Sequence, residues 1–293
     1  TNSGVRYSAL AESSSAIHSD NIEAPEEEPP SGELKLSKLQ NSHSETIVLK
    51  IVNRPPNTKN PGFPVSANSQ AFIQKYFPDT SHEQWNDWKW QVRNRIRTVE
   101  RVESMMTLTQ DEKESIIRRT GNLPIAITPY YFSLLSATDP NQALRKTHLP
   151  LSGEFIKTPG EDPDPLSEEH NTAVPGIVHR YPDRVLFLTT GFCSTYCRYC
   201  TRSRMVGETN GEYSFSTSNW KKGIEYIEAH PEIRDCLLSG GDPLSIGDDK
   251  LEWLLMRLRA IPHLEFIRIG TKIPVVMPQR ITKELCNMLK KYH

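Results

Sequence analysis

Three cysteines, Cys193, Cys197 and Cys200, stand within eight residues in the sequence CSTYCRYC. Thiolates are ligands for zinc and for iron–sulfur clusters. Zinc sites usually take four ligands and place cysteines in CxxC pairs, and His179 is the one candidate for a nearby fourth ligand. Three thiolates suit a [4Fe–4S] cluster with one iron open to an outside ligand. The spacing therefore favours a cluster over zinc, and three buried free thiols are the least favoured alternative.

The two remaining cysteines fall in other surroundings. Cys236 lies in a predicted strand and Cys286 in a predicted helix, where both are expected to be small buried hydrophobic residues. A total of five is odd and argues against a disulfide scaffold. A cluster and free thiols require reducing conditions, so we expect a cytoplasmic location.

The cysteine loop leaves a continuous apolar run at residues 185–189 (VLFLT), typical of a parallel strand buried on both faces. Loops at the carboxyl ends of such strands carry the functional sites of α/β folds. Three βα units in a row predict a parallel sheet or barrel, and three strands cannot close a barrel. The predicted strands are residues 185–189, 235–239 and 265–269, and the predicted helices are residues 220–230, 251–258 and 284–290, the last capped by Thr282.

A helical segment is predicted before this core, with order beginning near Asp79. Thr80 and Glu83 are spaced as a capping box, with Ser81 and Gln84 as an overlapping alternative. One long helix is predicted to follow, because apolar residues recur every three or four positions. They are Trp85, Trp88, Val92, Ile96, Val99 and Val102. The tryptophans here, which include Trp90, are expected to pack in a core rather than form a binding stripe.

Two further helices are predicted in this segment. Thr109 and Glu112 form another capping box, and Gly121 is a natural stop for that helix. Thr128 and Pro129 are N-cap and first-turn signals for the next helix. Residues 76–150 are therefore expected to be helical.

Composition divides the rest of the chain. Hydrophobic residues make up 36% of the 293, and residues 1–75 lower that figure because they are rich in Ser, Asn, Pro and Glu. We expect residues 1–75 to be a largely disordered polar extension. Residues 151–178 are expected to be a Pro-rich, acidic connecting loop, and residues 179–293 the incomplete (β/α) core. The sequence begins at Thr1 and ends within or just after a helix, so the natural chain is expected to continue.

Charge and hydrophobicity exclude some classes of function. Lys and Arg total 35 and Asp and Glu total 36, for a formal charge of −1. No global field attracts this protein to nucleic acid or to an anionic membrane. No apolar run reaches the roughly 20 residues that a transmembrane helix needs. We therefore expect neither a nucleic-acid partner nor a membrane protein.

The cysteine spacing resembles that of radical S-adenosylmethionine (SAM) enzymes. The resemblance implies that the open iron binds the amino and carboxylate groups of SAM, and that one electron cleaves SAM to a 5′-deoxyadenosyl radical. It also implies that Tyr199 packs on the adenine. Ser239, Gly240, Gly241 and Asp242 match the turn that ends the second strand, where glycines let the backbone approach the methionyl amine.

Residues 85–293 further resemble the lysine 2,3-aminomutase family. The matching stretches are residues 85–96 (WNDWKWQVRNRI), 126–131 (AITPYY), 174–184 (VPGIVHRYPDR), 193–204 (CSTYCRYCTRSR), 237–242 (LLSGGD) and 268–288 (RIGTKIPVVMPQRITKELCNM). The resemblance implies an α/β fold, a partial (β/α)6 barrel of which about the first half is present. It also implies that SAM and pyridoxal 5′-phosphate (PLP) together move an α-amino group to Cβ.

The family's PLP and substrate residues carry over to individual positions. Arg180 and Arg184 match ligands of the PLP phosphate, and Tyr181 between them adds a hydroxyl. Without the resemblance, a surface pair of one of these arginines with Asp183 is the simpler interpretation. Arg202 matches the arginine that binds the substrate carboxylate.

Other positions near the third strand and the cysteine loop are less specific. Gly270, Thr271 and Lys272 end the third strand, where family members contact SAM, and Lys272 replaces an arginine of the family pattern. Arg204 is expected to be a solvated or phosphate-side charge. Gln279 either faces the cofactors or is a structural amide.

The resemblance also implies residues that this sequence lacks. The lysine that bonds PLP and the acidic residues that bind a distal ammonium are expected beyond His293. Neither Lys290 nor Lys291 is proposed for that lysine, and a polypeptide ending at His293 is expected to be inactive.

Lysine to β-lysine is the default reaction that the resemblance implies. Glutamate or arginine 2,3-aminomutase, a relative acting on a protein-borne lysine, and a non-enzymatic metal-binding module remain alternatives. Expected partners are an amino acid substrate, an electron donor such as flavodoxin or ferredoxin, and further copies of the chain in a homo-oligomer.

Overall fold

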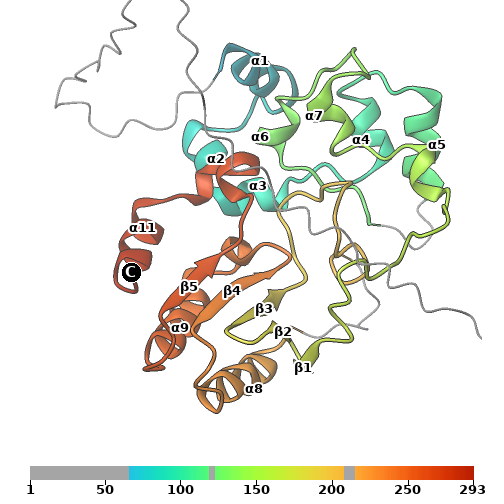
Figure 1. Cartoon of the computed structure of the whole chain (residues 1–293). Helices are drawn as coiled ribbons and strands as arrows, with labels where there is room; N and C mark the ends of the chain where they lie inside the picture. The colour runs from blue at the N-terminus through green and yellow to red at the C-terminus, as the bar shows by residue number, and fades with distance from the viewer. Residues whose placement is uncertain (1–65, 119–122, 208–214) are drawn as a thin grey trace, which may run out of the picture. The chain divides into compact units, whose positions relative to one another are not determined.

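A computed structural model describes residues 66–118, 123–207 and 215–293. Residues 1–65 of the predicted polar extension and the predicted helix stop at Gly121 lie outside these residues, whereas the end of that extension, predicted through residue 75, is helical. The described part joins a helical segment to an α/β sheet (Figure 1).

The helical segment begins earlier than the sequence predicts, at α1 rather than near Asp79. Ser66 accepts a hydrogen bond from the backbone N–H of Ser69 and caps α1, and Phe72 of α1 packs against Phe132. The helices are α1 (Ala67–Tyr76), α2 (His82–Asn86), α3 (Trp88–Arg93), α4 (Val99–Glu103), α5 (Gln110–Arg118), α6 (Pro129–Phe132), α7 (Ala143–Lys146) and the 3-10 turn η1 (Ser152–Phe155).

The predicted long helix is wrong, because α2, α3 and α4 are separate. Asp87 is extended and caps α3 by accepting from the N–H of Lys89. Ile96 forms an antiparallel bridge with Ile127 between α3 and α4. The apolar period still identified buried residues: Trp85 and Ile96 lie in the core, and Trp88 packs against it.

The predicted caps are largely confirmed. Ser81 with Gln84 is the capping box that forms at α2. Glu112 accepts from the backbone N–H of Thr109 at 2.8 Å, and its own N–H donates to Oγ1 of Thr109 at 3.2 Å. Thr128 caps α6, with Pro129 in the first turn.

The sheet has five strands in the order β1-β2-β3-β4-β5. The predicted parallel strands are confirmed as β3, β4 and β5, and the sheet is open, as a partial barrel requires. The strands are β1 (Thr172–Val174), β2 (Ile177–Tyr181), β3 (Arg184–Thr190), β4 (Asp235–Gly240) and β5 (Phe266–Ile269). The helices that follow are α8 (Thr217–Glu228), η2 (Pro243–Ser245), α9 (Asp248–Arg259), α10 (Ile273–Val276), η3 (Pro278–Arg280) and α11 (Lys283–Lys290).

Two antiparallel strands, β1 and β2, were not predicted. They occupy the end of the stretch expected to be irregular and are joined by a turn at Gly176, whose φ is +90°. Both strands are short and partly exposed, so their residues show little of the apolar pattern that marks a buried strand.

The two faces of the sheet have different roles. Phe187 and Leu238 lie in the main core together with buried residues of α8 and α9. Leu186, Leu237 and Arg268 are in register on β3, β4 and β5 and line a pocket on the opposite face. The helices therefore support the sheet from one side and leave the other side for a site.

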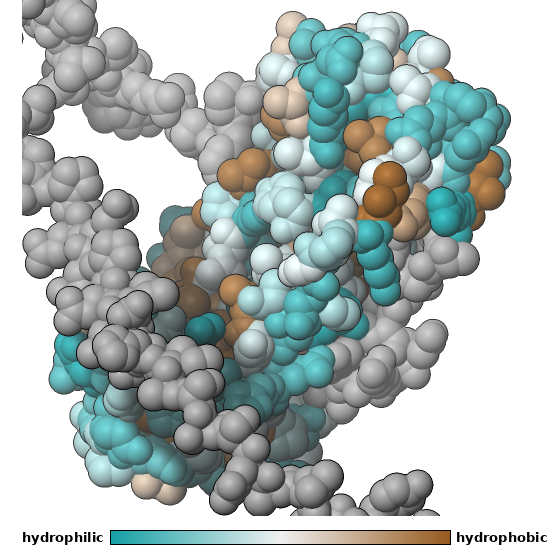
Figure 2. Space-filling view, turned by 45° about the vertical axis from the view of Figure 1, so that its right-hand side comes forward, coloured by the Kyte–Doolittle hydropathy of each residue, from teal (hydrophilic) through white to brown (hydrophobic). Residues whose placement is uncertain are grey.

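The surface view in Figure 2 shows hydrophobic residues as small patches among hydrophilic ones on the face drawn. Of the helices in the described ranges, none has the length and apolar character to cross a membrane. Cys236 is buried as predicted, whereas Cys286 is exposed on α11. That prediction was wrong because Cys286 lies on the side of the helix away from its buried Leu285 and Met288.

Candidate functional site

The three cysteines lie on the loop after β3 and are all half-buried. They line one pocket of about 430 Å³, hereafter the cluster pocket. The pocket also gathers the ends of β4 and β5, although these are far apart in sequence. All residues predicted to contact the cluster, SAM or the substrate carboxylate line it: Cys193, Cys197, Tyr199, Cys200, Arg202, Ser239, Gly240, Gly241, Asp242, Gly270, Thr271 and Lys272.

The helical segment holds the cysteine loop through hydrogen bonds to its backbone and side chains. The N–H of Tyr196 donates to the carbonyl of Ala126 at 3.0 Å, and the N–H of Arg198 donates to the carbonyl of Thr147 at 2.9 Å. Oγ1 of Thr195 accepts from the N–H of Thr128. Backbone bonds fix the loop without depending on side-chain rotamers, so the thiols have a defined framework.

Arg95 adds a side-chain contact that the sequence did not reveal. Its Nη1 donates to the carbonyl of Cys193 at 3.0 Å, and its guanidinium lies 4.5 Å from the ring centre of Phe192. Burial lowers the pKa of Arg95, but an arginine stays charged at any physiological pH. A fixed positive charge therefore lies next to the first cysteine.

The thiols differ in how readily they lose a proton. Burial, followed by the charge of Asp242, raises the pKa of Cys193 to about 12. A hydrogen bond from Cys200, opposed by burial and helped by Lys272, lowers the pKa of Cys197, and the same bond raises the pKa of its donor. Metal ligation requires thiolates, so metal binding here must release protons.

Two glycines bring the end of β4 against the cysteine loop. Gly240 has a φ of +108°, and a Cβ there would lie 2.5 Å from the carbonyl oxygen of Thr190. A Cβ at Gly241 would lie 2.4 Å from the carbonyl oxygen of Phe192. Real Cβ atoms do not approach this closely, so both positions require glycine for the close approach of two backbones.

Asp242 then joins the ends of β4 and β5. It is 5% exposed and accepts from Oγ1 of Thr271 at 2.6 Å, from the N–H of Lys272 at 2.7 Å and from the N–H of Leu244 at 3.1 Å. Burial raises its pKa. Lys272 hydrogen-bonds the hydroxyl of Tyr199 and lies 3.8 Å from its ring centre.

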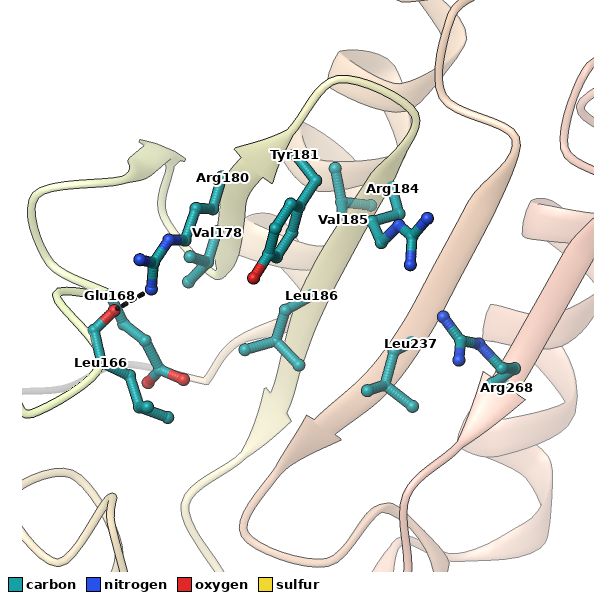
Figure 3. Close-up of a pocket in the computed structure, with 10 residues that line it drawn as sticks. All are labelled: Leu166, Glu168, Val178, Arg180, Tyr181, Arg184, Val185, Leu186, Leu237 and Arg268. Atoms are coloured by element: carbon teal, nitrogen blue, oxygen red, sulfur yellow. Dashed lines mark hydrogen bonds between the residues drawn. The ribbon is translucent and has the colours of Figure 1, made fainter. Parts of the chain in front are cut away.

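A second pocket of about 220 Å³, hereafter the arginine pocket, lies on the same face of the sheet (Figure 3). Arg180 and Tyr181 reach it from β2, Arg184 from the start of β3, and Arg268 from β5. The structure therefore separates the three residues predicted for the PLP phosphate from the cysteines, because the cysteines follow the opposite end of β3. Arg268 was not predicted from the sequence as a residue of this pocket. A charged residue inside the otherwise apolar end of the predicted strand EFIRI was a possible signal.

Most arginines of this pocket have partners. Nε of Arg184 donates to Asp183 at 3.0 Å, so the surface pair weighed from the sequence is present, and it holds the pKa of Asp183 below its usual range. Nε of Arg268 donates to Asp235 at 2.9 Å. Figure 3 shows Arg184 and Arg268 pointing toward one another. The carboxylates bound to each of them therefore reduce the repulsion between these two cations.

The structure separates His179 from the thiols. It lies on β2, beside the amino-terminal part of β3, and its Nδ1 is 2.8 Å from the hydroxyl of Tyr226. The hypothesis of a fourth cysteine-loop ligand at His179 is therefore wrong. Within the ranges that the structure describes, no three His, Cys, Asp or Glu side chains converge on a single ion. A [4Fe–4S] cluster needs no such convergence, because each thiolate binds a different iron.

Comparison with known proteins gives two kinds of match. Residues 187–293 match the Radical SAM superfamily. The chain is 53% identical over 219 residues to L-lysine 2,3-aminomutase of Acetoanaerobium sticklandii, and 50% identical over 217 residues to that of Clostridium subterminale. Over about three quarters of its length the chain is similar to the lysine 2,3-aminomutase family. These matches cover 75% and 74% of this chain and 52% of each relative.

The chain thus spans about half the length of these curated relatives. A glutamate 2,3-aminomutase of Clostridioides difficile is also similar, with 42% identity over 213 residues that cover 73% of this chain and 50% of the relative. The Radical SAM match and the similarity to lysine 2,3-aminomutases imply a [4Fe–4S] cluster, SAM and PLP.

Both pockets fit the groups that this family binds. The cluster pocket offers three thiols and a backbone turn without side-chain bulk at Gly240 and Gly241. The exposed ring of Tyr199 offers a flat apolar surface at its rim. The arginine pocket offers several guanidiniums over an apolar floor of Leu186 and Leu237, which suits a phosphate attached to an aromatic ring.

Arg202 and Arg204 follow the last cysteine and are both ion-paired. Arg202 lines the cluster pocket and contacts Ser239 and Glu168. The side chain of Arg204 is only 12% exposed and pairs with Asp164 at 2.7 Å and with Glu169 at 2.9 Å. The expectation of a solvated or phosphate-side Arg204 is therefore wrong. Gln279 is buried in η3 and does not line either pocket.

Proposed function

We propose that this protein is a SAM- and PLP-dependent 2,3-aminomutase that moves the α-amino group of L-lysine to Cβ. The observation that carries the proposal is one sheet face with two pockets, one built on three cysteines and the other on arginines. The predominance of lysine 2,3-aminomutases among the relatives supports the substrate.

In this proposal the cysteine loop provides the ligands of the cluster. Cys193, Cys197 and Cys200 each ligate one iron and leave the fourth open. Together the reduced cluster, SAM and PLP supply radical chemistry and a carrier for the amino group. The helical segment and the glycine turn hold the loop, so the thiols keep one geometry.

The residues around the loop bind SAM in the same proposal. The backbone of Gly240 and Gly241 accepts the amino group, and Tyr199 packs on the adenine. Asp242 fixes Thr271 and Lys272, which bring the end of β5 to the same ligand. Ser239 and Gly270 contribute polar backbone at the pocket wall.

The arginine pocket binds the phosphate of PLP. Arg180 and Arg184 present guanidinium forks to the dianion, and Tyr181 donates a hydrogen bond from its hydroxyl. Arg268 adds a further positive charge from β5. Arg202 binds the carboxylate of the amino acid from the cluster pocket, and this contact is the same for any α-amino acid.

The second candidate is glutamate as the substrate, which the similarity to a glutamate 2,3-aminomutase supports. The residues assigned above bind groups common to both substrates, so they do not separate the two. We further propose a low-potential one-electron donor, such as flavodoxin or ferredoxin, and a homo-oligomeric enzyme.

The test is metal analysis followed by substrate assays on the full-length protein reconstituted without oxygen. We expect about four irons per chain, an electron paramagnetic resonance signal that changes with SAM, and conversion of L-lysine to β-lysine. One tightly held zinc without iron would contradict the proposal. Conversion of glutamate or arginine in place of lysine would contradict the substrate alone.

A further inference from the structure

An acidic loop, residues 164–169, lies beside both pockets. Leu166 and Glu168 line the arginine pocket, where Nη1 of Arg180 donates to the carbonyl of Leu166 at 3.3 Å (Figure 3). Glu168 also pairs with Arg202, which lines the cluster pocket. The ion pair of Glu168 and Arg202 therefore joins the two pockets.

The pair has a specific geometry. Oε1 of Glu168 lies 2.7 Å from Nη2 and 2.9 Å from Nε of Arg202, and Oε2 lies 3.0 Å from Nε. The carboxylate thus occupies the Nε and Nη2 edge of the guanidinium. Nη1 is directed to Oγ of Ser239 at 3.4 Å, in the cluster pocket. A guanidinium has a second edge, formed by Nη1 and Nη2, and can bind another carboxylate there.

The backbone around Glu168 is fixed by its own loop. Ser167 has a φ of +50°, a conformation that non-glycine residues rarely adopt. Nδ2 of Asn171 donates to the carbonyl of Ser167 at 2.7 Å, and Oγ1 of Thr172 donates to the carbonyl of Glu168 at 2.8 Å. The side chain of Glu168 is 5% exposed and that of Arg202 is 20% exposed. The loop therefore presents a buried carboxylate to a partly open arginine.

We propose that Glu168 is a positioning residue for Arg202. By occupying the Nε and Nη2 edge, it aims the other edge into the cluster pocket, where that edge binds the carboxylate of the amino acid substrate. The inference rests on the proposed function for the role of Arg202. Arg204 pairs with Asp164 and Glu169 of the same loop and lies 3.5 Å from Oε2 of Glu168, so it holds the loop and the carboxylate in place.

The test compares two probes, L-lysine and L-lysine amide, with full-length holoenzyme and its Glu168→Gln variant. Loss of a charged hydrogen bond that orients the guanidinium should raise KM for L-lysine about tenfold and leave kcat within about twofold. The amide lacks the carboxylate, so its KM should not change. Glu168→Asp keeps the charge and should recover part of the affinity for L-lysine.

Glu265→Gln is the matched control, because it neutralises an exposed carboxylate that pairs with Arg234 at 2.8 Å, and it should change neither KM. A lower KM for L-lysine in Glu168→Gln would overturn the proposal, because Glu168 would then be a competitor that substrate displaces. An equal change for both probes, or loss of iron or of the SAM-dependent spectroscopic signal, would overturn it too.

If wild-type enzyme uses neither probe, the proposed function has failed. The positioning role is then tested alone, by the crystal structure of Glu168→Gln. A guanidinium of Arg202 turned away from Ser239 supports the role, and an unchanged guanidinium overturns it.

Discussion

The cluster pocket and the arginine pocket lie on one face of one sheet but are built in different ways. The cysteine loop is held by hydrogen bonds whose partners on the other side lie in the helical segment. The arginine pocket consists of long side chains on strands, paired with carboxylates such as Asp183 and Asp235 that are partly open to solvent. One pocket is fixed, whereas the other can adjust.

This difference fits the needs of the two ligands that we propose for these pockets. A cluster requires thiols at set positions, whereas a phosphate accepts guanidiniums from several directions. The part that matches the Radical SAM superfamily begins at residue 187, yet Arg95, Ala126 and Thr147 hold the cysteine loop from outside it. The helical segment therefore adds contacts that hold the cysteine loop from outside this part of the chain.

The largest effect is expected from Cys193→Ala in the full-length protein. Removing one of three thiolates should abolish the cluster, so iron content should fall and no SAM-dependent paramagnetic signal should appear. Cys286→Ala is the control, because that thiol is exposed and lies outside the cluster pocket. Activity that survives Cys193→Ala would contradict the assignment of the fixed pocket.

The next largest effect is expected when the helical segment that holds the cysteine loop is destabilised. Arg145 is fully buried in α7 and donates to both oxygens of Glu112, at 2.8 and 2.7 Å, and Thr147, whose carbonyl accepts from the cysteine loop, is the C-cap of the same helix. Arg145→Met leaves a buried carboxylate unpaired and should lower the free energy of unfolding by about 3–5 kcal/mol. Lys113→Met, in an exposed pair with Glu103, should cost about 0–1 kcal/mol.

The same ion pair gives a pH dependence. Burial acts to raise the pKa of Glu112, but hydrogen bonds from Arg145 and Thr109 outweigh it and hold the pKa below its ordinary 4.5. A lowered carboxyl pKa stabilises the fold above pH 4.5, and this stabilisation is lost as the pH falls through the folded pKa. Unfolding curves between pH 3 and 6 should therefore show a steeper acid loss for wild type than for Arg145→Met. Parallel curves would show that this pair does not support the segment.

The smallest effect is expected in the arginine pocket. Arg184→Gln removes one of several cations there and should weaken PLP binding only about three- to tenfold, because Arg180 and Arg268 remain. The measurement is a PLP titration followed by absorbance, with iron content as the second readout. Arg234→Gln, outside this pocket, is the control. A parallel loss of iron would mean that the two pockets are not independent.

Short-range patterns accounted for much of the fold and site. The cysteine loop, the turn at Gly240 and Gly241, and strands β3 to β5 were predictable because apolar runs and close spacings carry their signal. The family pattern identified Arg180 and Arg184, but not that they lie at the opposite end of β3 from the cysteines.

The features that were missed depend on contacts between distant segments. Arg95 is 98 residues from Cys193, and Glu168 lies in a stretch that resembled an ordinary acidic loop. Strands β1 and β2 were hidden because they are short and partly exposed. A short stretch of sequence does not show which arginine will pair with a given carboxylate in the folded protein.

One hydrogen bond has a consequence for the order of assembly. Oγ1 of Thr128 donates to the carbonyl of Val276 at 2.7 Å, across 148 residues, while the N–H of the same residue holds the cysteine loop at Thr195. A contact between residues so far apart in sequence requires a long loop of chain to close, which costs conformational entropy, and such contacts form slowly. The cysteine loop therefore reaches its final form only after the segments around Thr128 and Val276 have met, and iron is expected to bind after that contact has formed.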